Sequence, residues 1–258
     1  MRFAGLGRVL FGLSFAAIGA LIIGFHDFAV AWRVLPKAIA WHDQLVLASG
    51  AILLVGGLGL LVPRTARVSA LSLAGFLLVR EFLLQMPHVV AHPQLELTWY
   101  DVCENLLLIG GAWTIFSMRP PDDGMLAKLG NARAGQILFG LALPAIGLSH
   151  FFYLNMTTPL IPSWLPFHVP LAYLTGAAHI AAGLGIVFGV LPRLAATLEA
   201  VMVSLFTLLV WVPIIVAAPT NFGNWSEFCV STAISGAAWA VADSFRGRSW
   251  AWRASLKS

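Results

Sequence analysis

The chain has 258 residues, of which 59% are hydrophobic and 10% are charged. A soluble domain has about 25% charged residues, so this composition excludes an ordinary water-soluble protein and indicates an integral membrane protein. The net charge of +4 does not indicate a nucleic-acid partner, because the basic residues lie in the connections between apolar segments. The expected partner is the lipid bilayer.

Taken in chain order, eight apolar segments approach the ~20 residues that a spanning helix needs. Their apolar residues come in runs and not in alternation, which favours helices over the strands of a membrane barrel. The first segment is not treated as a signal peptide, because parts of it recur in the middle of the chain. The predicted helices are residues 9–27, 44–62, 65–86, 99–118, 134–156, 171–191, 193–217 and 223–243.

The connections differ in character. Residues 27–43 contain Trp and Pro and predict an interfacial segment, and the third helix is expected to end at Pro87. Residues 119–133 begin Arg-Pro-Pro-Asp-Asp-Gly and predict a cytoplasmic linker. Residues 244–258 predict a basic cytoplasmic tail, in which Lys and Arg are interleaved with Trp. That composition suits an anionic inner-leaflet surface.

A fifteen-residue window, 99–113, returns at 225–239, an offset of 126 (225 − 99). Self-similarity at a fixed offset indicates an internal repeat. The helix pattern repeats with the window, so we predict two four-helix repeats, residues 1–118 and 134–243. An even number of spans per repeat makes the two repeats parallel, related by a pseudo-twofold axis along the membrane normal. The identical positions in the first window are Trp99, Cys103, Gly110, Ala112 and Trp113.

The distribution of Lys and Arg predicts the orientation. With the N-terminus inside, the inner segments hold 12 of these residues and the outer segments hold only Arg33 and Lys37, while Arg80 lies within a helix. The positive-inside rule then places both termini in the cytoplasm.

The second half carries the clearest motifs, which are Leu138-Phe-Gly-Leu141, a loop rich in Pro, Thr175-Gly176 and Pro192-Arg193. This pattern resembles the DoxX-like family of small four-helix membrane proteins, and the first half is a looser copy. The family is named after a subunit associated with a quinol oxidase and with thiosulfate:quinone oxidoreductase. The resemblance implies an accessory or ligand-binding subunit of a quinone-linked redox system in a bacterial inner membrane. Members often carry an acid three residues after the Thr-Gly glycine, where this chain has His179 and, in the first half, Leu53.

Ionisable residues inside a bilayer are costly and are therefore functional candidates. Arg80 lies about 9 Å below the outer end of its predicted helix, at ~1.5 Å per residue, and is suited to a bidentate carboxylate partner. We predict a polar cluster in the outer leaflet, which either binds a ligand or handles protons, or else is a structural ion pair. Its candidate members are Arg80, Glu81, Asp101, Glu104, His26 and Asp27.

The second half offers histidines near the outer helix ends. His150 and His179, with Tyr153 nearby, either hydrogen-bond a quinone carbonyl or another small ligand, or pack as satisfied polar residues. Haem ligation would need two helices to present histidines at one depth, and nothing else in the sequence marks a haem site. We therefore consider a quinone as the cofactor and expect neither haem nor a metal site. Glu199 is predicted to be structural, pairing with Arg193 or reaching water.

Three functions stay open: a redox accessory subunit, a carrier or binder of a small or lipidic solute, and a membrane scaffold without a ligand. The sequence has no nucleophile–base pair, phosphate loop or nucleotide fingerprint, so we do not expect a self-contained enzyme. The glycines predict close helix packing within each repeat. The alternative is a homodimer seam at Gly185 and Gly189, and other membrane subunits are further candidate partners.

Overall fold

The computed structural model describes residues 5–29, 40–118 and 130–250. The regular structure within these ranges is all helical, which confirms the all-α prediction. Parts of the predicted interfacial segment, linker and basic tail, residues 30–39, 119–129 and 251–258, lie outside the described residues. The elements are α1 (Leu6–Phe25), α2 (His42–Leu61), α3 (Ala66–Arg80), the π-helix η3 (Glu81–Gln85), α4 (Met86–Ala91), α5 (Glu96–Ser117), α7 (Ala132–Phe152), α8 (Leu154–Thr157), the 3-10 turn η4 (Thr158–Leu160), α9 (His168–Phe188), α10 (Pro192–Phe206), the π-helix η5 (Thr207–Trp211), α11 (Val212–Ala217) and α12 (Phe222–Ser244).

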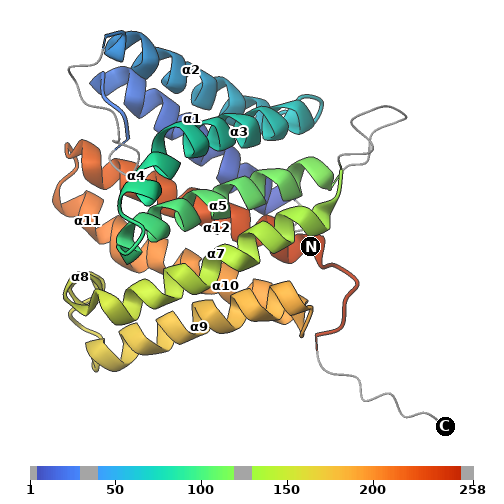
Figure 1. The fold of residues 1–258 in the computed structure, drawn as a ribbon, viewed down its shortest axis with the longest axis vertical. Helices are drawn as coiled ribbons and strands as arrows, with labels where there is room; N and C mark the ends of the chain where they lie inside the picture. The colour runs from blue at the N-terminus through green and yellow to red at the C-terminus, as the bar shows by residue number, and fades with distance from the viewer. Residues whose placement is uncertain (1–4, 30–39, 119–129, 251–258) are drawn as a thin grey trace.

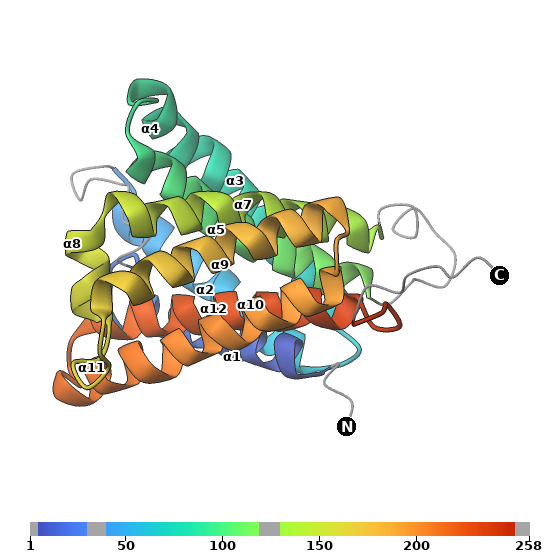
Figure 2. The same cartoon turned by 90° about the horizontal axis from the view of Figure 1, so that it is seen from below.

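Six helices within the described residues are long and apolar enough to cross a membrane, which supports an integral membrane protein. They are α1, α2, α3 continued into α4, α7, α9, and α10 continued into α11. The other two predicted spans, α5 and α12, have 22 and 23 residues but are less apolar. Both lie at the centre of the bundle (Figures 1 and 2), where much of their surface meets other helices instead of lipid. Polar residues such as Asn105 and Ser226 are therefore buried in protein.

The helices form a closed ring, and two of its members, α5 and α12, also contact each other across the middle. Neighbours around the ring are α1 and α2, α2 and α3, α3 and α5, α5 and α7, α7 and α9, α9 and α10, α10 and α12, and α12 and α1. The first helix of each half thus packs on the last helix of the other half, α1 on α12 and α7 on α5. The two predicted repeats interlock along these two seams.

Glycines allow the backbones to approach within each half. A Cβ atom on Gly57 of α2 would lie 2.6 Å from the carbonyl oxygen of Gly12 in α1, and one on Gly183 of α9 would lie 2.6 Å from the carbonyl oxygen of Gly140 in α7. Small residues at these positions are needed because lipid gives no hydrophobic drive for helices to associate. A Cβ on Gly185 would meet Ala195 of the same chain, so this glycine already packs inside the molecule.

Corresponding helices of the two halves begin at the same 126-residue offset as the repeated sequence windows. α2 and α9 begin at His42 and His168, α5 and α12 begin at Glu96 and Phe222, and each pair is 126 residues apart (168 − 42 and 222 − 96). The π-helices η3 and η5 begin at residues 81 and 207, the same distance apart.

The expectation that the third helix ends at Pro87 is wrong. The helix widens into η3, where the Met86 N–H donates to the Glu81 carbonyl, and then continues as α4 to Ala91. A proline lacks an N–H and its ring crowds the preceding turn of an α-helix. The wider π turn just before Pro87 accommodates that crowding, so the chain bends without ending the helix.

The two ends of the bundle differ. Figures 1 and 2 show α4, α8 and α11 at one end, and the start of α1 with the end of α12 at the other. At this second end, Arg8 donates to the carbonyl oxygen of Leu60, and Arg133 donates to that of Ile186 at 2.8 Å. These carbonyls close the C-terminal turns of α2 and α9, which basic side chains stabilise. They are 126 residues apart (186 − 60), so each half is capped in the same way.

Candidate functional site

A cavity of about 550 Å³ lies at the α8 and α11 end of the bundle. Its walls come from α5, α7, α8, α9, α10 with η5, and α12, together with the segment between α8 and α9. This volume lies within the range of pockets that hold drug-sized molecules. Most of the wall is Leu, Ile, Val and Met. The polar and titratable residues that line it are Tyr100, Glu104, Ser149, His150, Tyr153, Thr157, Thr175, His179, Glu199, Glu227 and Ser231.

A buried histidine–glutamate pair forms part of this wall. His179 on α9 and Glu199 on α10 are 3% and 1% exposed, and His179 Nδ1 lies 2.9 Å from Glu199 Oε1. The other carboxylate oxygen, Oε2, is buried and has no hydrogen-bond partner among the described residues. The prediction that Glu199 pairs with Arg193 or reaches water is wrong. Arg193 instead donates to the Arg248 carbonyl; it lies about 9 Å before Glu199 along α10, on a different face of the helix.

His150 extends the pair into a small aromatic group. Its ring centroid lies 5.3 Å from that of His179, edge to face, and Phe206 of α10 lies 5.9 Å from His179 and 6.4 Å from His150. His150 Nδ1 lies 3.0 Å from the Thr175 hydroxyl of α9, which orients the ring. Both predicted histidines and Tyr153 therefore line one cavity.

At the 126-residue offset of the predicted repeat, the first half has two leucines. Leu53 lies 126 residues before His179 (179 − 53), and Leu73 lies 126 residues before Glu199 (199 − 73). Both leucines are fully buried. A well-packed apolar pair is often as stable as a buried ion pair in the same space, or more stable. The packing of these helices therefore does not require the His179–Glu199 pair.

The predicted cluster around Arg80 is assembled on the other side of α5. Arg80 and Glu81 are buried, and the Arg80 guanidinium interacts with the charges of Glu81, Glu104 and Asp101. Glu81 Oε2 accepts a hydrogen bond from Asn105 Nδ2 on α5. Four of the six predicted members are thus brought together.

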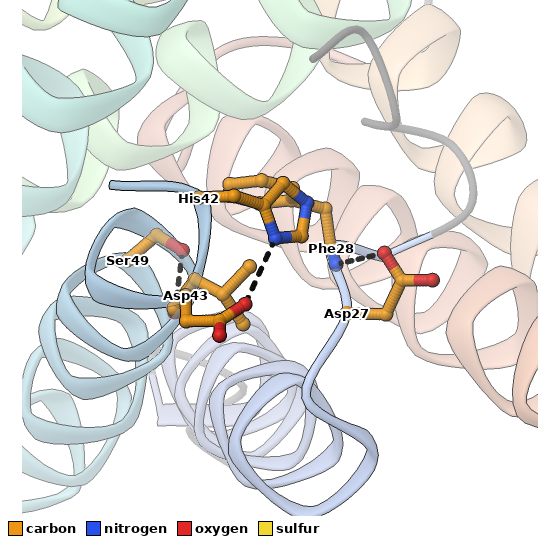
Figure 3. Close-up of polar contacts among 6 residues, drawn as sticks. Asp27, Phe28, His42, Asp43 and Ser49 are labelled. Atoms are coloured by element: carbon orange, nitrogen blue, oxygen red, sulfur yellow. Dashed lines mark hydrogen bonds and ion pairs between the residues drawn. The ribbon is translucent and has the colours of Figure 1, made fainter. Parts of the chain in front are cut away.

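The remaining two members, His26 and Asp27, lie elsewhere. His26 is an exposed residue that ends α1, and α1 packs on α2 and α12. Asp27 Oδ1 accepts a hydrogen bond from the backbone N–H of Phe28 at 2.9 Å (Figure 3). The same close-up shows His42 Nδ1 beside the Asp43 carboxylate, 3.2 Å away. Asp27 and Phe28 thus follow the end of α1, and the Phe28 ring packs edge to face on His42 at the start of α2.

Glu104 connects the Arg80 cluster with the cavity. It interacts with Arg80, and it also lines the cavity with Glu227, its neighbour on α12. Tyr100, one turn earlier on α5, lies beside the Glu104 carboxylate.

Reasoning from the sequence missed the pairing of Glu199 with His179. The signal that could have found it is the contrast between Glu199 and Leu73 at equivalent positions of the two halves.

No protein-family model, curated protein or solved structure matches the chain. The DoxX-like family therefore stays a prediction from the motifs. Within the described residues, no group of three or more His, Cys, Asp or Glu side chains is arranged to hold a metal ion.

Proposed function

We propose that this chain binds a small amphipathic molecule within the membrane, in the cavity at the α8 and α11 end. The observation that carries this function is the buried His179–Glu199 pair in the cavity wall, at a place where the first half has Leu53 and Leu73. Ionisable groups inside a membrane protein are costly and usually serve a ligand or ion. The apolar wall would hold the body of the molecule, and the polar residues would hold its head.

The proposed membrane arrangement has eight spans in two parallel DoxX-like repeats. The six apolar helices support it directly, and α5 and α12 run through the centre between them. The start of α1 and the end of α12 lie at the same end of the bundle (Figure 1), as both termini in the cytoplasm require. In this arrangement the cavity lies toward the outer side of the membrane. The positive-inside count supports the same orientation.

A quinone-linked role in a bacterial inner membrane is the version of this function that the family resemblance implies. His150 and His179 lie side by side in the wall, and an imidazole N–H can hydrogen-bond a quinone carbonyl. In this version the chain is an accessory subunit that holds the quinone for a partner. The alternative version is a carrier or binder of another small or lipidic solute.

The test uses the first half of the chain as its own control. The wild type and the double variant His179→Leu/Glu199→Leu are purified in mild detergent, and their co-extracted small molecules are identified by mass spectrometry beside a visible absorption spectrum. The wild type should carry a molecule that the double variant lacks, while both unfold at similar temperatures. Identical extracts from the two proteins would overturn the proposed site. A wild-type extract without quinone or chromophore would overturn the redox version, and an extract without any bound molecule would favour a scaffold.

A further inference from the structure

We infer that the cavity takes an amphipathic organic cation, an inference that rests on the proposed function and specifies its ligand. Three carboxylates line the cavity from three different helices: Glu104 on α5, Glu199 on α10 and Glu227 on α12. Its lining residues, all within the described ranges, include no Lys and no Arg. An apolar cavity that carries three carboxyl groups and, besides His150 and His179, no basic side chain favours a guest with a positive charge.

The nearest guanidinium does not balance these acids. Arg80 interacts with Glu81, Glu104 and Asp101, so one positive charge already faces three carboxylates. Glu104 interacts in addition with Glu227 across the α5 and α12 contact. Buried acids in a low-dielectric environment either stay protonated or ionise beside an opposite charge. A cation between Glu104 and Glu227 would supply that opposite charge.

Glu199 points to a ligand independently of the other two acids. Its Oε1 is bonded to His179, whereas its Oε2 is buried at the cavity wall without a hydrogen-bond partner among the described residues. A buried oxygen of this kind is rare, since native proteins pair nearly all of their buried polar atoms. The N–H of an ammonium guest in the cavity would satisfy this oxygen, and a second anion would not.

The aromatic residues of the wall suit the same guest. Tyr100, Tyr153, Phe206 and Trp211 line the cavity from α5, the end of α7, α10 and η5. The faces of aromatic rings attract ammonium and phosphonium groups, most strongly where water is excluded. The apolar remainder of the wall would hold the hydrocarbon body of the cation. A neutral quinone would fill the volume but would not stabilise the ionised form of the carboxyl groups.

The experiment compares two probes of nearly equal shape that differ in charge. Methyltriphenylphosphonium is a cation, and triphenylphosphine oxide is its neutral counterpart with oxygen in place of the methyl group. Binding of each probe to the full-length protein in lipid nanodiscs is measured by isothermal titration calorimetry. Binding of a short-chain quinone is measured separately in the same way. The cation should bind at least about tenfold more tightly than the oxide and the quinone.

Variants test which carboxylates interact with the bound cation. Glu104→Gln and Glu227→Gln should each weaken binding of the cation by about tenfold and leave binding of the oxide unchanged. Asp43→Asn removes an exposed carboxylate that is not part of the cavity lining and is the control. Equal binding of the cation and the oxide, or binding of the quinone alone, would overturn the inference and leave the proposed function standing. If no probe binds and no molecule is co-extracted, both are overturned.

Discussion

The Thr207 hydroxyl lies 2.7 Å from the Ser231 hydroxyl, where the other half of the chain pairs Glu81 with Asn105. Each pair joins the first residue of a π-helix to the central helix of the same half. The two pairs are 126 residues apart (207 − 81 and 231 − 105). π-Helical turns are rare and often lie at functional sites. Here both turns contact the central helices, which carry Glu104 and Glu227.

The two pairs should differ in their contribution to stability. Asn105→Leu removes the donor to a buried carboxylate, so we expect it to lower the free energy of unfolding by about 3 kcal/mol. Ser231→Ala removes one of two hydroxyl contacts of Thr207 and should cost about 1 kcal/mol or less. Thermal unfolding in detergent, followed by intrinsic fluorescence, measures both. Equal losses would show that Asn105 is not needed to hold the Glu81 carboxylate.

The His179–Glu199 pair should behave as a coupled unit. His179→Leu leaves Glu199 buried without its partner and should cost about 3–5 kcal/mol. The double variant His179→Leu/Glu199→Leu reproduces the leucine pair of the first half, so it should recover most or all of that loss. A double-mutant cycle on thermal unfolding gives the coupling energy. A double variant no more stable than the His179→Leu single variant would contradict the equivalence of the two places.

The close glycine contacts should tolerate no added methyl group. A Cβ at position 57 would meet the backbone of α1, which cannot yield as a flexible side chain would, so Gly57→Ala should cost about 1–3 kcal/mol. Gly75 of α3 has open space where a Cβ would lie, with nothing within 4 Å, and serves as the control. Gly75→Ala should be neutral or stabilising by about 0.5–1 kcal/mol, because alanine favours the helix. The unfolding temperatures of the two variants test this contrast directly.

The proposed orientation can be tested with cysteine labelling. In a background with Cys103 and Cys229 replaced by Ser, Thr65→Cys and Ser163→Cys place thiols at exposed residues on opposite ends of the bundle. A membrane-impermeant maleimide should label position 163 in intact cells, and position 65 only in inverted vesicles. Labelling of both positions from the same side would exclude the proposed spans, and the reversed pattern would invert the orientation.

Most helix bounds could be predicted from the sequence alone. The predicted range 44–62 corresponds to His42–Leu61, and 223–243 corresponds to Phe222–Ser244. Long apolar runs end where Pro, Gly or charged residues begin, so their limits are visible without a structure. The continuation past Pro87 was not predictable in this way, because a π turn leaves no mark in the hydropathy pattern.

The partners of the helices were harder to predict. In a bilayer the lipid-facing and the protein-facing sides of a helix are both apolar, so periodicity does not indicate which helix packs on which. The packing of α1 on α12 and of α7 on α5 is a property of the whole chain. For the same reason the pairing of His179 with Glu199 could not be predicted, since the two residues lie on different helices.

The packing of α1 on α12 and of α7 on α5 explains why the site can occur only once in the chain. A homodimer of identical four-helix subunits arranged in this way would place every side chain twice, so a glutamate added to one wall would appear in the other. Joining the two halves in one polypeptide lifts that restriction. One half can keep Leu53 and Leu73 buried in its core, while the other has His179 and Glu199 at the positions 126 residues later. The covalent link between the halves is what allows this difference.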